Sequence, residues 1–132
     1  MEESPVMSEQ TVTTGEVVAA FLEACGVQVA FGVISIHNLP MLDALGRRAV
    51  IRFVPTRGEA GAVNMADAYA RTQGALGVAF TSTGTGAGNA AGALIEAETA
   101  GTPLLHLTGQ IDLPYLDQGR GYIHEAKAQL EM

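Results

Sequence analysis

Short apolar runs alternate along this chain with longer segments in which apolar residues recur at helical spacing. The runs predict strands at residues 27–31, 50–54, 76–80 and 104–108. None of them alternates between apolar and polar residues, which is typical of strands buried on both faces of a parallel sheet. Helical segments precede the first run and separate the others. This order predicts an α/β fold with three layers, in which helices cover both faces of a doubly wound, mostly parallel sheet.

The first predicted helix covers residues 17–25 and is preceded by a capping box, formed by Thr13 and Glu16. Its predicted buried face consists of Val17, Ala20, Phe21 and Ala24. A second helix is expected between Asn38, a favoured N-cap residue, and Gly46, with Pro40 in its first turn. The third and fourth helices are expected at residues 57–73 and 87–100, and both are rich in alanine and glycine.

The junction between the second strand and the third helix carries one carboxylate, Glu59. Thr56 and Glu59 have the spacing of another capping box, which predicts a structural role for the carboxylate. The alternative is a carboxylate that faces a ligand, because open α/β sheets bind ligands outside the carboxyl ends of their strands. Residue type and spacing leave both interpretations open and, by themselves, favour the cap.

A glycine-rich segment, residues 83–89, follows the third strand. Glycines at such a position can direct backbone N–H groups toward an anion, and the start of the next helix adds partial positive charge. The spacing matches neither the dinucleotide-binding fingerprint nor a P-loop. A tight turn that lets the helix pack closely on the sheet explains the glycines equally well.

Length, composition and charge narrow the classes of protein to which this chain can belong. The 132 residues suffice for one domain, expected at residues 12–132 after a flexible tail at 1–11, and 48% of them are apolar. A net charge of −7 without a Lys/Arg cluster argues against a nucleic-acid or anionic-membrane surface. No apolar run reaches about 18 residues, the length of a membrane span. The acidic, polar N-terminus is unlike a signal peptide, so a cytoplasmic protein is expected.

The candidate proton carriers and metal ligands are few. His37 and His124 fall in predicted loops, where a histidine can carry protons near neutral pH or simply serve as a polar surface residue. His106 lies within the last strand and is expected to be a hydrogen-bonded core residue. The single cysteine, Cys25, excludes an internal disulfide and is expected to be buried. The sequence shows no metal-ligand spacing, and no metal site is expected.

Four motifs occur together in a characteristic order. They are Phe31-Gly32 followed by Leu39-Pro40-x-x-Asp43-Ala44-Leu45; Arg57-Gly58-Glu59-x-x-Ala62 with Ala66-x-x-Tyr69-Ala70-Arg71; Thr83-Gly84-x-Gly86-x-x-Asn89; and Pro103-Leu104-Leu105-x-Leu107-Thr108-Gly109. Together they resemble the N-terminal pyrimidine-binding (PYR) domain of the thiamine-diphosphate enzymes. That group includes acetolactate synthase, pyruvate oxidase, benzoylformate decarboxylase and benzaldehyde lyase. The resemblance extends over about residues 12–130.

The resemblance implies a role for Glu59. The matching glutamate of the family hydrogen-bonds the ring nitrogen of the cofactor's aminopyrimidine, and a proton held there favours the tautomer that activates the cofactor. The resemblance further implies cofactor contacts by Ile34, Thr83, Gly86 and Asn89. The residues that it places on the substrate side are Ile36, His37 and His124.

Some positions depart from the family pattern. Ile34-Ser35 replaces a frequent Pro-Gly, Ile36 stands where some decarboxylases carry a polar substrate-facing residue, and Gly84-Thr85-Gly86 replaces the usual Gly-Pro-Gly. His37 falls where benzaldehyde lyase has a histidine, and His124 falls where acetolactate synthases usually have glutamine. The departures leave the cofactor half of the resemblance intact, and they bear on which substrate the chain would accept.

The resemblance also implies partners. Family members hold the diphosphate and Mg²⁺ of thiamine diphosphate in a separate C-terminal domain with a Gly-Asp-Gly motif, and this sequence contains neither that motif nor the family's middle domain. The chain is therefore expected to be a truncated piece or a split subunit, inactive alone, that supplies half a site. The missing half would come in cis or from another chain. A homodimer or larger assembly is expected, because the small-residue helix faces need covering.

The implied reaction cleaves or forms a C–C bond next to a carbonyl of a 2-oxo acid or aldehyde, as in an acetolactate synthase-like transferase or lyase. The alternative is a non-catalytic dimerisation domain that retains the fold. A free-standing nucleotide-binding domain is disfavoured, because the phosphate-binding fingerprints are missing.

Overall fold

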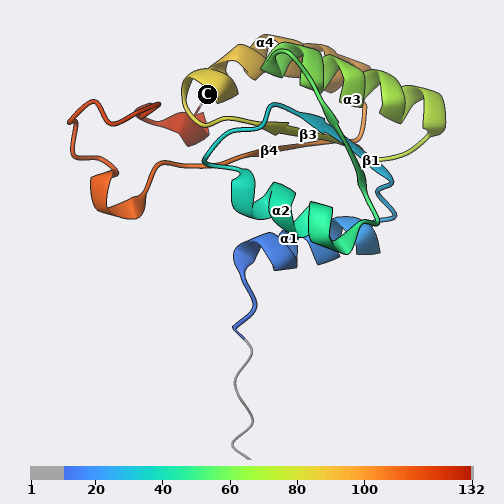
Figure 1. Ribbon diagram of the computed structural model, residues 1–132. Helices are drawn as coiled ribbons and strands as arrows, with labels where there is room; N and C mark the ends of the chain where they lie inside the picture. Colours follow the sequence, from blue (N-terminus) through green and yellow to red (C-terminus); the bar gives the residue numbers. More distant parts are fainter. Residues whose placement is uncertain (1–10, 132) are drawn as a thin grey trace, which may run out of the picture.

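A computed structural model describes residues 11–131 and contains a single sheet of four parallel strands in the order β2-β1-β3-β4. The strands are β1 (Val29–Gly32), β2 (Arg52–Pro55), β3 (Gly77–Thr81) and β4 (Leu104–Thr108). Helices α1 (Thr14–Ala24) and α2 (Leu39–Arg48) cover one face, and α3 (Glu59–Gln73) and α4 (Thr85–Ala100) cover the other (Figure 1). The predicted three-layer, doubly wound fold is confirmed.

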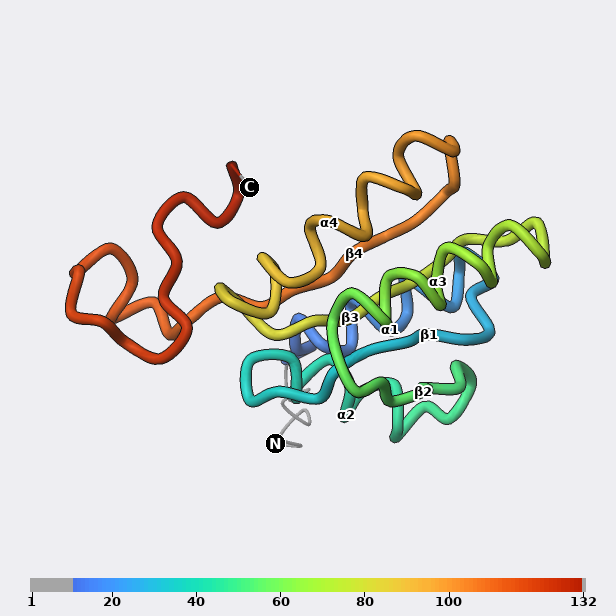
Figure 2. The backbone as a smooth tube through the Cα atoms, turned by 90° about the horizontal axis from the view of Figure 1, so that it is seen from above, coloured from blue at the N-terminus to red at the C-terminus, as the bar shows by residue number. Residues whose placement is uncertain are grey.

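The chain after β4 lies beyond the carboxyl ends of the strands (Figure 2). It contains two one-turn 3-10 helices, η1 (Leu113–Tyr115) and η2 (Gln129–Glu131). Its apolar residues Ile123 and Leu130 are 67% and 98% exposed, so these side chains do not add to the core of the domain. None of the helices within residues 11–131 is long and apolar enough to cross a membrane. The tail predicted at residues 1–11 lies, apart from Thr11, outside the described residues.

The hydrophobic core is divided by the sheet. Leu22, Leu45 and Phe80 are buried on the side of α1 and α2, whereas Val63 and Ala90 are buried on the side of α3 and α4. The central strand β3 is buried along its whole length, as expected of a strand covered on both faces. The expectation is wrong for β2, whose two end residues are exposed because it lies at an edge of the sheet.

Helix α1 is capped as predicted, but a different face of the helix is buried. Thr13 Oγ1 accepts a hydrogen bond from the Glu16 backbone N–H at 3.3 Å. The buried residues of α1 are Gly15, Ala19 and Leu22, whereas Val17 and Phe21 of the predicted face are each 56% exposed, and Ala20 and Ala24 are exposed too. The physical reason is the packing of α1 on α2: a Cβ at Gly15 would overlap the carbonyl oxygen of Pro40, so only glycine allows this approach.

Two further local predictions are wrong. Helix α2 does not end at Gly46 but continues to Arg48, where the guanidinium pairs with Glu23 of α1 at 2.5 Å, and Ala49 closes the helix with a φ of 53°. Cys25 is exposed rather than buried, because it is the C-cap of α1 and α1 ends at the surface.

His106 on β4 is hydrogen-bonded as the sequence predicts, but it is half-buried rather than a core residue. Its Nε2 lies 2.7 Å from Thr81 Oγ1, and burial lowers the pKa of the imidazole below its ordinary value near 6.5. Because the unfolded chain then takes up the proton more readily, the free energy of unfolding should be constant above about pH 7.5 and fall as the pH drops through about 6.5. Urea unfolding between pH 5 and 8 tests this. His106→Gln should flatten that part of the profile, and an unchanged slope in the variant would contradict the assignment.

Candidate functional site

Glu59 is the first residue of α3 and lies just beyond the carboxyl end of β2. The predicted capping box at its start is wrong: the N-cap is Gly58, no side chain caps the helix, and Thr56 Oγ1 donates to the Gly58 carbonyl at 3.1 Å. The helix begins two residues later than the box requires, so the Glu59 side chain cannot return to the N-cap. A carboxylate at this end of a helix remains favourable through the helix dipole. The structure therefore excludes the capping interpretation of Glu59.

The Glu59 carboxylate faces the start of α4. Its Oε2 accepts a long hydrogen bond, 3.4 Å, from Asn89 Nδ2. A Cβ at Gly86 would lie 2.9 Å from Glu59 Oε1 and 2.7 Å from Ser82 Cβ. Within residues 11–131 no Lys, Arg or His side chain forms an ion pair with Glu59, which is half-buried. The carboxylate is thus held beside a glycine backbone and has capacity for another hydrogen bond.

The glycine-rich segment is a sharp turn followed directly by helix, rather than one long turn. Gly84, at a left-handed φ of 56°, makes the bend, and α4 already begins at Thr85. A Cβ at Gly84 would overlap the carbonyl oxygen of His124, and Gly86 N donates to the Thr83 carbonyl at 3.1 Å. The segment therefore contacts Glu59 on one side and the C-terminal part of the chain on the other.

The two histidines that the resemblance places on the substrate side are neighbours. The ring centroids of His37 and His124 are 6.0 Å apart in an edge-to-face arrangement. Thr85 Oγ1 lies 2.8 Å from His124 Nδ1, whereas His37 Nδ1 and Ser35 Oγ are buried and have no hydrogen-bond partner among residues 11–131. Both rings lie at the carboxyl end of the sheet, beside the segment that also contacts Glu59.

Asn38 is a site-building residue that sequence reasoning misassigned. It occupies the N-cap position of α2, but its fully buried side chain does not cap the helix. Its Oδ1 accepts from Ser35 N at 2.9 Å, and its Nδ2 donates to the carbonyls of Val33 and Thr81 at 2.8 and 3.2 Å. Asn38 thereby ties the loop after β1 to the end of β3. Nothing in its local sequence indicates this long-range contact.

The other predicted site residues are exposed or engaged with other residues. Ile34 is 58% exposed and lines an apolar groove of about 470 Å³ beside α2 and β2, and Ile36 is 75% exposed. Thr83 is fully buried, and its hydroxyl lies 2.5 Å from Gln129 Oε1. The structure brings together Glu59, Gly86 and Asn89.

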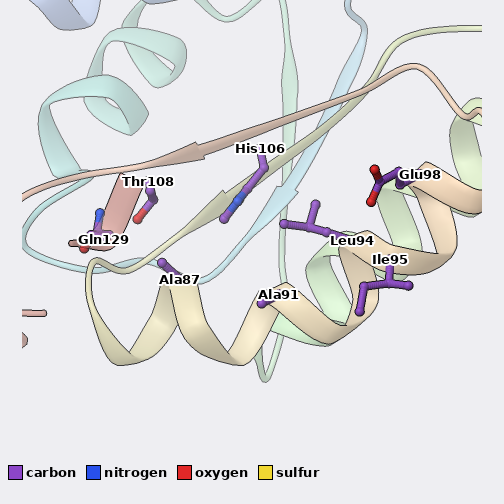
Figure 3. A pocket seen from close by; sticks show the side chains of 8 residues that line it. All are labelled: Ala87, Ala91, Leu94, Ile95, Glu98, His106, Thr108 and Gln129. Atoms are coloured by element: carbon purple, nitrogen blue, oxygen red, sulfur yellow. The ribbon is translucent and has the colours of Figure 1, made fainter. Parts of the chain in front are cut away.

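A second groove, of about 320 Å³, lies between α4 and β4 (Figure 3). Glu98 lies toward one end, Thr108 and Gln129 lie at the other, and His106 lies between them. None of the predicted site residues lines this groove. Across residues 11–131, no group of three or more His, Cys, Asp or Glu side chains is placed to hold a metal ion.

The fold and the position of Glu59 define a class: a doubly wound domain with a carboxylate at the ligand-binding edge of a parallel sheet. Comparison with known families makes the class specific. Residues 12–132 match the family described as thiamine pyrophosphate enzyme, N-terminal TPP binding domain, and the chain belongs to this family. Thiamine pyrophosphate is another name for thiamine diphosphate, so the predicted resemblance is confirmed.

Individual relatives carry out several reactions. The chain is 37% identical over 97% of its length to a probable 2-ketoarginine decarboxylase of Pseudomonas aeruginosa, and spans 23% of that protein. It is 33% identical over 78% of its length to the acetolactate synthase large subunit of Lactococcus lactis, and 41% identical over 89% to human 2-hydroxyacyl-CoA lyase 2. It spans 18% of each of these two proteins. The similarity therefore covers one domain of much longer enzymes.

Proposed function

We propose that this chain supplies the pyrimidine-binding half of a thiamine-diphosphate site, with Glu59 as the residue that contacts the aminopyrimidine. The observation that carries the proposal is the Glu59 carboxylate, which neither caps a helix nor forms an ion pair within residues 11–131 and lies against the backbone of Gly86. Family membership supplies the cofactor class. When bound, thiamine diphosphate supplies the electron sink for reactions at a carbonyl carbon.

The residues around Glu59 fit an aromatic ring nitrogen. The carboxyl group can hold a proton toward that nitrogen and pass it back, and within the described part of the chain the long Asn89 hydrogen bond is its one side-chain competitor. Asn89 orients the carboxyl group from the side of α4. The absence of a side chain at Gly86 lets Glu59 lie directly against the helix backbone. Thr83, whose hydroxyl is engaged by Gln129, would shape the site through its backbone rather than contact the cofactor itself.

The reaction in which this half-site takes part would cleave or form a C–C bond next to the carbonyl of a 2-oxo acid or aldehyde. Support comes from relatives named as decarboxylase, synthase and lyase. His37 and His124, neighbours at the same edge, would handle protons of the substrate. A second domain, in cis or on another chain, would hold the diphosphate and Mg²⁺, within a homodimer or larger assembly.

Calorimetric titration tests the proposal. Thiamine diphosphate with Mg²⁺ is titrated into this chain alone and then into a mixture with a candidate diphosphate-binding domain. Heat of binding that requires both proteins and is weakened in Glu59→Gln supports the shared site. Absence of binding in the mixture, with association of the two proteins verified by sedimentation, would overturn it.

A second candidate function is a non-catalytic association domain. The specific observation in its favour is the apolar stripe on α1, where Val17 and Phe21 are each 56% exposed although α1 is well packed on its other side. The same sedimentation experiment separates the two functions. Self-association without cofactor binding in any mixture would favour the association domain.

Gly86→Ala should displace the Glu59 carboxyl group and weaken cofactor binding. The added Cβ would lie 2.9 Å from Glu59 Oε1, so the carboxyl group must move, and we expect the affinity for thiamine diphosphate in the complete assembly to fall about tenfold or more. Gly88→Ala is the matched control, because nothing lies within 4 Å of a Cβ there. It should leave the affinity unchanged and slightly stabilise α4. Equal affinities for the two variants, measured by calorimetry, would contradict the contact.

A further inference from the structure

Gln129 connects three segments that are far apart in the sequence. It lies in η2, and its Oε1 accepts hydrogen bonds from Thr83 Oγ1 at 2.5 Å and from the backbone N–H of Gly84 at 2.7 Å. Its Nε2 donates to the carbonyl of Gly109 at 3.0 Å. One side chain thus joins the turn between β3 and α4 to the end of β4.

These hydrogen bonds satisfy groups that have little access to water. Thr83 is fully buried and Gly84 is buried as well, so their donors need an acceptor within the protein. Gly84 also has the left-handed conformation that allows α4 to start at Thr85. The Gln129 amide is therefore placed to hold the bend from which the first turn of α4 extends.

The bend is connected to Glu59 by contacts on the other side. Gly86 N donates to the Thr83 carbonyl at 3.1 Å, and the Gly86 backbone lies directly against the Glu59 carboxylate. A shift of residues 83–84 would therefore displace the surface on which Glu59 rests. Asn89, which donates to Glu59, is on the same turn-and-helix unit and would move with it.

We propose that Gln129 is a positioning residue for Glu59, acting through Thr83, Gly84 and Gly86. The inference rests on the proposed function for its catalytic meaning, whereas the mechanical connection can be measured on the chain alone. The C-terminal segment, which contains Gln129 and packs on the candidate site, therefore has a part in shaping that site.

Two variants separate the bonds that Gln129 makes. Gln129→Met keeps the length of the side chain and removes all three hydrogen bonds. Gln129→Glu keeps the acceptor for Thr83 and Gly84 but loses the donor to Gly109. Gln118→Met is the control, because Gln118 is an exposed glutamine of the same segment that bonds only locally, to Pro114.

The readouts are the amide resonance of Gly84, the ¹³C resonance of the Glu59 carboxyl carbon, and the affinity for thiamine diphosphate in the complete assembly. Gln129→Met should shift both resonances and weaken the affinity about fivefold or more. Gln129→Glu should restore most of the Glu59 signal, and Gln118→Met should leave all three readouts unchanged. Unfolding midpoints measured in parallel show whether each variant is folded.

A Gln129→Met chain that is folded, with a shifted Gly84 amide and an unchanged Glu59 resonance, would overturn the positioning role. Failure of the proposed function has a different signature. In that case the wild-type assembly binds no thiamine diphosphate, while the two resonances still respond together to Gln129→Met.

Discussion

Glu59→Gln should reduce proton–deuterium exchange at the thiazolium C2 of thiamine diphosphate, and turnover, by about 10²- to 10⁴-fold in the assembled enzyme. Glutamine retains the size of glutamate and its hydrogen-bonding capacity toward Asn89, so the local structure should persist. It cannot give or take a proton, which is the role proposed for the Glu59 carboxyl group. The exchange is measured by NMR in deuterated buffer, with added Mg²⁺ and the diphosphate-binding partner.

Glu98→Gln is the control for charge. Glu98 is an exposed carboxylate on α4 that lines the separate groove between α4 and β4. Its replacement by glutamine changes the net charge by the same amount as Glu59→Gln. The rate of C2 exchange in Glu98→Gln should match that of the wild type. Exchange in Glu59→Gln at the wild-type rate, at a cofactor concentration that saturates the variant, would refute the part of Glu59 in proton transfer.

Asn38→Ala should have the second large effect, a loss of about 2–4 kcal/mol in the free energy of unfolding. The fully buried amide makes three hydrogen bonds, and its removal leaves the buried Thr81 carbonyl without this donor. The loop after β1 would also lose its attachment to β3, which should disturb the neighbouring His37. Urea unfolding monitored by circular dichroism measures the loss.

Asn64→Ala is the matched control, because Asn64 is exposed in the middle of α3, where alanine is a better helix former. It should leave the stability unchanged or slightly raised. If Asn38→Ala loses less than about 1 kcal/mol, the Asn38 network contributes no more than a single ordinary hydrogen bond. The loop would then be held by other contacts.

Where the sequence failed, the failures share a cause. The predicted buried face of α1 is exposed, because the rotation of that helix is set by the contact between Gly15 and the backbone of Pro40, which is 25 residues away along the chain. The capping box at Thr56 failed because the Thr56 backbone N–H donates to the Gly32 carbonyl of β1 at 2.8 Å, so the chain stays extended and α3 starts only at Glu59. In both cases the sequence has the expected local pattern, but a contact with a distant part of the chain decided the local structure.

By itself, the sequence determined the fold class, the number of strands and their positions along the chain, the last strand residue for residue, and the family. Continuous apolar runs between helical segments suffice for the fold, because burial on both faces of a sheet depends on local composition. The family followed instead from the four motifs, and residues 12–132 match that family. The sequence also singled out Glu59, through the motif around it.

Only the tertiary structure decided how Glu59 is held and which residues surround it. Gly86 and Asn89 reach it from α4, while Gln129 and Asn38 hold the flanking turns from distant positions. These contacts join segments separated by up to 46 residues. A single amide bridging such segments leaves no periodic or compositional trace, because most of its partners are backbone groups that every residue has.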